Sequence, residues 1–211
     1  LGMDARRPER PDVLATLPPD ALLPILAFGQ RETAADILEI RTVAFLSESL
    51  DKFLTMEHDH LWALYDAIMV LDSQNVGACF RGSMFISAVA NRPDSAIHML
   101  TLTLGTEDPE FPYGEVHSAR SQVRSEHPQT WLLYHEYASV YFLLLRPRTD
   151  DPERKQELSR RAGELWMLAG SQPGGPESLL SVGRKLASEG WTPLQGFEQE
   201  RVLWEQRSTS G

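Results

Sequence analysis

The side chains in this sequence that could do chemistry are few and scattered. One cluster has metal-ligand types, Glu57, His58, Asp59 and His60, whose donors suit zinc or a similar ion. Neighbours along a helix point in different directions, so only a loop could bring these donors together. We therefore expect a solvated helix start, with His58 or Asp59 capping the helix that follows, and no metal centre.

The remaining reactive side chains do not form a recognisable catalytic set. Cys79 falls on the apolar side of an expected helix, where a free cysteine is usually a small buried hydrophobe. The other histidines have no acidic residue at a telling spacing: His98, His117, His127 and His135. One loop contains three carboxylates that could pair for acid–base catalysis, Glu107, Glu110 and Glu115. However, a loop rich in acidic residues and proline is more often simply solvated. The sequence also lacks the common phosphate-loop, dinucleotide, hydrolase-elbow and zinc-protease motifs, so we expect no enzyme, cofactor or metal.

Composition places the chain with ordinary globular proteins. It has 211 residues, 42% hydrophobic and 24% charged, with a formal net charge of −10 that argues against a nucleic-acid surface. No run reaches the roughly 20 apolar residues that span a bilayer, so the chain as given is expected to be soluble. Because the first residue is Leu1, an upstream anchor or targeting segment stays open, and the localisation is not predicted.

Apolar residues recur at helical spacing in almost every segment, which predicts an all-α fold. The clearest stripe is Leu61, Leu64, Tyr65, Ile68 and Leu71. Two overlapping stripes precede it and predict a helix buried on more than one side: Ala34, Ile37, Leu38, Ile40, Ala44 and Phe45. We expect an extended segment over 1–19, one helical domain over 20–206 and a tail over 207–211.

Helix ends are marked by local signals. Capping residues followed by proline predict helix starts at Asp151-Pro152, Gly175-Pro176 and Thr192-Pro193, and Asp94 after Pro93 predicts another. Gly170 and Gly190 are expected as left-handed C-terminal caps. Leu100, Leu102 and Leu104 alternate with threonines as in a strand, but the Ile97, Leu100 and Leu104 spacing favours a helix. A short helix is expected within 116–125.

Small and large residues recur at the spacing of a two-helix repeat. The second helix of such a repeat has a small residue, then a large apolar residue four positions later, then a small residue three positions after that. This pattern occurs here at Ala162, Trp166 and Ala169, and more loosely at Ala96, Leu100 and Thr103. In first helices, a small residue precedes an aromatic by three, as Gly82 with Phe85 and Ala138 with Tyr141. Residues 71–75, Leu-Asp-Ser-Gln-Asn, are similar to the turn that joins such repeats.

The chain therefore resembles a tetratricopeptide-repeat protein over roughly residues 58–190. The resemblance implies a short α-solenoid of about eight or nine helices, with degenerate repeats at about 58–109 and 127–176. The segment 28–38 is similar to the opening helix of a group of bacterial tetratricopeptide-like proteins, in which a membrane segment often precedes this region.

The resemblance also implies a role in binding another protein. In this family the first helices line a concave groove, which here corresponds to Val76, Cys79, Ser83, Ile86, Trp131, Leu132, His135, Ser139 and Phe142. Because these side chains carry no Lys or Arg, a partner segment would be held by apolar anchors, with Ile86 and Phe142 as hot spots. We expect a non-enzymatic scaffold module of a bacterial assembly. A permanent structural subunit and a metal-dependent enzyme around His58 and His60 are the alternatives.

Overall fold

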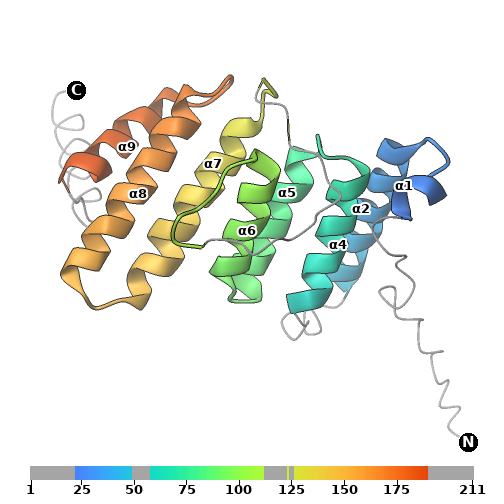
Figure 1. Cartoon of the computed structure of the whole chain (residues 1–211), viewed down its shortest axis with the longest axis horizontal. Coiled ribbons are helices and arrows are strands. Elements are labelled where there is room, and N and C mark those ends of the chain that lie inside the picture. Colours follow the sequence, from blue (N-terminus) through green and yellow to red (C-terminus); the bar gives the residue numbers. More distant parts are fainter. Residues whose placement is uncertain (1–21, 49–57, 112–122, 124–125, 190–211) are drawn as a thin grey trace, which may run out of the picture.

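The computed structural model describes residues 22–48, 58–111, 123 and 126–189, and every regular element in these residues is helical (Figure 1). This confirms the predicted all-α class and the helical reading of residues 100–104. The expected helix within 116–125 and the predicted ends at Gly190 and Thr192-Pro193 lie outside the described residues. The elements are α1 (Leu23–Leu26), α2 (Arg31–Glu48), α4 (His58–Leu71), α5 (Val76–Met84), the π-helix η1 (Phe85–Val89), α6 (Pro93–Leu104), α7 (Thr130–Ser139), the π-helix η2 (Val140–Leu145), the 3-10 turn η3 (Arg146–Arg148), α8 (Pro152–Ser171) and α9 (Glu177–Glu189).

The helices lie side by side in chain order, from α1 and α2 at one end to α8 and α9 at the other (Figure 1). Contacts run mainly between chain neighbours: α2 with α4, α5 with α6, α7 with α8, and α8 with α9. α5 also packs against α7, which joins the two halves of the described stack. None of the helices within these residues is long and apolar enough to cross a membrane.

The core contains the apolar stripe expected on α4. Leu61, Tyr65 and Ile68 have no exposed surface, and Leu64 and Leu71 are also buried. The burial predicted for Ala162, Trp166 and Ala169 on α8 is likewise confirmed.

The prediction that α2 is buried on more than one side is wrong. Ala35 and Thr42 are buried and point into the molecule, but Ile37 and Ile40 are 50% and 69% exposed. The reason is position: α2 is the outermost long helix at its end of the stack, and one of its sides has no neighbour among the described helices. An apolar pattern shows which residues gain by leaving water, and it does not show whether the same chain covers them.

Helix ends agree with the local signals only in part. Asp151 caps α8, since its carboxylate accepts a hydrogen bond from the Glu153 amide, and Pro152 is the first helical residue as expected. Asp94 does not cap α6; it lies in the first turn and pairs with Arg92. Gly170 is not a C-terminal cap either, because α8 continues to Ser171 and is capped by Gln172 in an extended conformation. A left-handed C-terminal cap is instead found at Gly105, after α6.

Gly170 instead belongs to a very close contact between α8 and α9. A Cβ atom placed on Gly170 would lie 2.9 Å from the backbone nitrogen of Leu180. A Cβ on Gly163 would lie 2.6 Å from the carbonyl oxygen of Gly183, and a Cβ on Gly183 would lie 2.6 Å from that of Gly163. The two helix backbones therefore touch along a line of glycines.

α5 and α7 both change from α to π geometry at their C-terminal ends. α5 continues into η1, and α7 continues into η2. A π turn inserts one extra residue per turn, and it rotates the side chains beyond it relative to an uninterrupted α-helix. No local sequence signal predicted these turns.

Candidate functional site

The face of α7 and η2 that carries the second group of predicted groove residues is partly open to solvent. Leu132, His135 and Ser139 follow one another at helical spacing and are half-buried. Leu143, four residues beyond Ser139, is 61% exposed. We call Leu132, His135, Ser139 and Leu143 the α7 row.

Aromatic rings lie beside the α7 row and bring two helices together. The His135 ring centroid is 6.3 Å from that of Trp131 on the same helix and 6.3 Å from that of Trp166 on α8. Phe142, which is almost fully buried, packs at 5.5 Å from Trp166. The Arg146 guanidinium lies 5.3 Å from the centre of the Phe142 ring. The structure thus assembles Trp131, His135 and Phe142 of the predicted groove around Trp166.

The electrostatics of this cluster suit apolar contacts. Burial lowers the pKa of His135 below its ordinary value of 6.5, so the imidazole is neutral at physiological pH. The indole nitrogen of Trp166 is buried and has no hydrogen-bond partner in the described structure. An aromatic surface with a neutral imidazole can hold an aliphatic or aromatic side chain. Within the described residues, the side-chain contacts of His135 are with the rings of Trp131 and Trp166, and no carboxylate pairs with it to make it a base.

The predicted groove residues of the first repeat lie in the core. Val76, Cys79, Ser83 and Ile86 are each at most 1% exposed. Cys79 shows the reason, because its Sγ atom lies 3.1 Å from Oγ1 of Thr103 and 3.9 Å from the carbonyl oxygen of Met99, both on α6. This face of α5 therefore packs against α6, and as described it offers no surface to a partner.

The other chemistry-bearing residues are not brought together. Within the described ranges no three His, Cys, Asp or Glu side chains converge to hold a metal ion. The side chains of His58 and His60 lie outside those ranges, as does Glu115. Glu107 is exposed, and Glu110 forms an ion pair with Arg154 of α8.

The best-connected polar group is one that the sequence did not single out. Asp108, after α6, is 1% exposed, and its Oδ2 atom accepts hydrogen bonds from the hydroxyls of Tyr137 and Tyr141, the latter at 2.8 Å. Its Oδ1 atom accepts from the amides of Glu110 and Phe111 at 2.9 and 3.3 Å. The guanidinium of Arg161 on α8 approaches Oδ2 to 4.0 Å.

The Asp108 contacts fasten the segment after α6 onto α7 and η2. The Phe111 ring packs edge-on against Tyr141, with centroids 6.4 Å apart. Burial, and then the hydrogen bond to Asp108, raise the pKa of both tyrosines, so both hydroxyls stay protonated as donors. An aspartate before proline is an ordinary turn signal, and nothing local shows that it reaches helices about 30 residues away in sequence.

No protein-family model, curated protein or solved structure matches this chain significantly.

The burial of Glu136 on α7 predicts a pH dependence of stability. Glu136 is 8% exposed, and burial raises its pKa to about 7 from an ordinary value of 4.5. Between these values the folded protein holds a proton that the unfolded chain releases, so this group makes the free energy of unfolding fall as the pH rises from about 4.5 to about 7. Glu136→Gln should remove that slope and raise stability above about pH 7 by about 1–2 kcal/mol, since a buried amide keeps part of the desolvation cost.

Urea unfolding over a pH series measures this effect. Glu107→Gln, at an exposed position, is the control and should leave the slope unchanged. A slope equal in the parent and in Glu136→Gln would show that Glu136 does not hold the proton.

Proposed function

We propose that the protein is a non-enzymatic interaction module of the tetratricopeptide-like kind, in which stacked helix pairs form a short solenoid and the α7 row holds a segment of another protein. The module would belong to a bacterial multiprotein assembly, as the resemblance of residues 28–38 implies.

The order and packing of the elements support the solenoid part of this proposal. α5, η1 and α6 follow one another in the order that α7, η2 and α8 also have, apart from the 3-10 turn η3 before α8, and each first helix ends in a π turn. Ala138 is fully buried. Gly82 is also buried, and it lies so close to α4 that an added Cβ would be 2.6 Å from the Tyr65 ring. These are the positions where the repeat requires small side chains.

The observation that carries the binding part is the α7 row itself. It combines an exposed leucine with half-buried aromatic and apolar side chains over a rigid cluster of rings. Rigid aromatic anchors at a partly open surface are typical of binding hot spots. The row contains no charged residue, so a partner segment would bind through apolar anchors. That segment would be extended or helical.

Selection of a random peptide library on the immobilised protein tests this function. The enriched peptide is then titrated by fluorescence anisotropy. We expect apolar or aromatic anchors in the peptide and an affinity that changes little between low and high salt, because apolar burial is insensitive to ionic screening.

Two leucines provide a matched pair of variants. Leu143→Asp, in the α7 row, should weaken peptide binding by about tenfold or more, since it puts a charge where an apolar anchor docks. Leu168→Asp is the control, because Leu168 is 46% exposed but points to the opposite side of α8 from Trp166. Full binding by Leu143→Asp, or a steep loss of affinity with salt, would remove the α7 row as the site.

A second candidate function, a permanent structural subunit, is favoured by a different observation. Large apolar side chains are exposed at the α1 and α2 end of the molecule, away from the α7 row. A solenoid whose terminal helix lacks a polar outer face needs something to cover it.

A further inference from the structure

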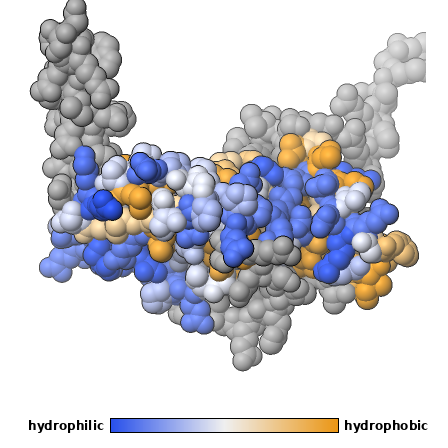
Figure 2. Space-filling view, turned by 90° about the horizontal axis from the view of Figure 1, so that it is seen from above, coloured by the Kyte–Doolittle hydropathy of each residue, from blue (hydrophilic) through white to orange (hydrophobic). Residues whose placement is uncertain are grey.

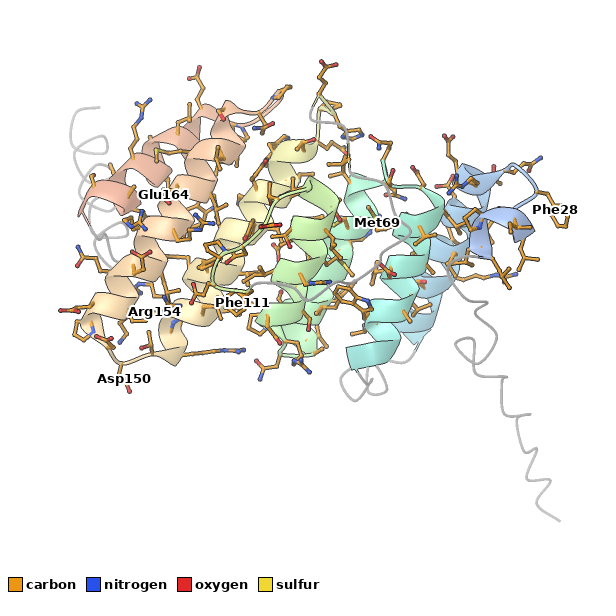
Figure 3. The ribbon with its side chains drawn as sticks, viewed as in Figure 1. Phe28, Met69, Phe111, Asp150, Arg154 and Glu164 are labelled. Atoms are coloured by element: carbon orange, nitrogen blue, oxygen red, sulfur yellow. The ribbon has the colours of Figure 1, made fainter. Side chains whose placement is uncertain are left out.

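Most of the exposed large hydrophobic side chains in the described residues lie on or beside α1 and α2. The described residues include ten exposed large hydrophobic side chains, and seven of these ten belong to residues 22–43. We call these seven the end surface: Leu22, Ile25, Leu26, Phe28, Ile37, Ile40 and Val43. Figure 2 shows hydrophobic side chains gathered at this end, and Phe28, which is 89% exposed, lies at its tip (Figure 3). Exposed hydrophobic side chains gathered in this way mark an interaction site.

The opposite side of α2 is fixed to the rest of the protein. Glu39 forms an ion pair with Arg81 of α5, and its Oε2 atom accepts a hydrogen bond of 2.8 Å from Asn75, the residue that caps α5. Glu39 follows Ile37 by two residues, so the two side chains point to opposite sides of the helix. The contacts of Glu39 therefore hold Ile37 and Ile40 outward.

The outward side of α2 has the pattern of a helix that pairs with another helix. Ile37, Ile40 and Ala44 are separated by three and then four residues, which is the a, d, a spacing of a coiled coil. Asp36 precedes Ile37 at a g position, and Arg41 follows Ile40 at an e position; both are exposed. No ion pair within the described residues engages either of them.

These two charges distinguish between arrangements of two identical helices. In a parallel pair, a g residue lies beside the e residue five positions later in the partner, so Asp36 would meet Arg41 of the second copy twice by symmetry. In an antiparallel pair, g positions face g positions and e positions face e positions. Asp36 would then face Asp36 of the second copy, and Arg41 would face Arg41. Parallel pairing also brings both α1 elements to the same end, where Ile25, Leu26 and Phe28 extend the contact.

We propose that a second copy of this chain covers the end surface, forming a parallel two-fold dimer through α2. A lipid surface fits less well, because the chain carries a net charge of −10 and the rim of the end surface mixes both signs. The dimer is independent of the α7 row, which lies elsewhere on the molecule.

Molar mass by sedimentation equilibrium over a wide concentration range tests the dimer. The parent protein should be dimeric, and the double variant Ile37→Asp/Ile40→Asp should be a monomer with an unchanged circular dichroism spectrum, because both side chains are exposed in the single chain. Its Tm should be lower than that of the parent and independent of concentration, because it loses the stabilisation that dimerisation gives. Leu168→Asp, another exposed position, should stay dimeric. A monomeric parent protein, or a dimer unaffected by the double variant, would overturn the proposal.

Charge reversal tests the parallel orientation. Asp36→Arg alone and Arg41→Asp alone should each weaken dimerisation roughly tenfold, since each turns two attractive pairs into repulsive ones. The variant with both changes should recover the parent affinity, and an equimolar mixture of the two single variants should form heterodimers. Failure of the doubly changed variant to recover would exclude the parallel pairing. Co-sedimentation of the parent with anionic lipid vesicles, lost in Ile37→Asp/Ile40→Asp, would assign the end surface to a membrane and also overturn the proposal.

Discussion

Asp108→Ala is expected to lower the free energy of unfolding by about 3–5 kcal/mol. The substitution removes a buried carboxylate that accepts hydrogen bonds from Tyr137, Tyr141 and two backbone amides. It leaves both hydroxyls without this acceptor in a region where they are nearly inaccessible to water, and it leaves Arg161 without the nearby negative charge. Denaturant unfolding followed by circular dichroism measures the loss.

Two tyrosine substitutions provide the matched control. Tyr141→Phe should cost about 1–3 kcal/mol, because its hydroxyl donates to a charged acceptor. Tyr65→Phe should be neutral or slightly stabilising, since the hydroxyl of Tyr65 is buried with no hydrogen-bond partner in the described structure. Equal effects of the two substitutions would mean that the bond to Asp108 contributes nothing.

Gly163→Ala should destabilise the protein by about 2–3 kcal/mol, although alanine is normally the better helix former. The added methyl group would lie 2.6 Å from the Gly183 carbonyl oxygen and 2.7 Å from the Ala187 nitrogen. Both are backbone atoms, so relief requires α8 and α9 to move apart along their whole contact. Thermal and urea unfolding both report the change.

Gly77→Ala is the control for this glycine. The atoms nearest to a Cβ on Gly77 belong to the guanidinium of Arg81, at 3.2 Å and beyond, and the end of that flexible side chain can move. This substitution should be neutral or stabilise the protein by up to about 1 kcal/mol through helix propensity. If Gly163→Ala is as well tolerated as Gly77→Ala, the two helices are not in backbone contact.

The helical class and much of the core followed from local patterns. Leu61, Tyr65 and Ile68 recur at the helical period and are buried, and Asp151 before Pro152 caps α8 as expected. These features depend on residues within one or two turns of each other, so the sequence contains nearly all the relevant interactions. The small residues Ala138 and Ala162 were also correctly expected to be buried.

The candidate site could be predicted only in part from the sequence. The resemblance selected His135 and Phe142, and the structure places them with Trp166 on an adjoining helix. The same reasoning selected Cys79 and Ile86, which are buried because that side of α5 faces α6. The π turns and insertions change how each helix is rotated against its neighbours, and a repeat pattern defined for regular α-helices does not include that rotation.

By itself, the sequence determined which residues form helices and which sides of those helices avoid water. Only the tertiary structure decided which other segment, if any, packs against each of those sides. It showed that Asp108 is enclosed by groups from α7 and α8, that Gly163 meets Gly183, and that Ile37 on α2 stays exposed. The physical reason is range: helix formation and capping act between residues a few positions apart, whereas burial of a carboxylate or an apolar side depends on which distant segment of a chain packs against it.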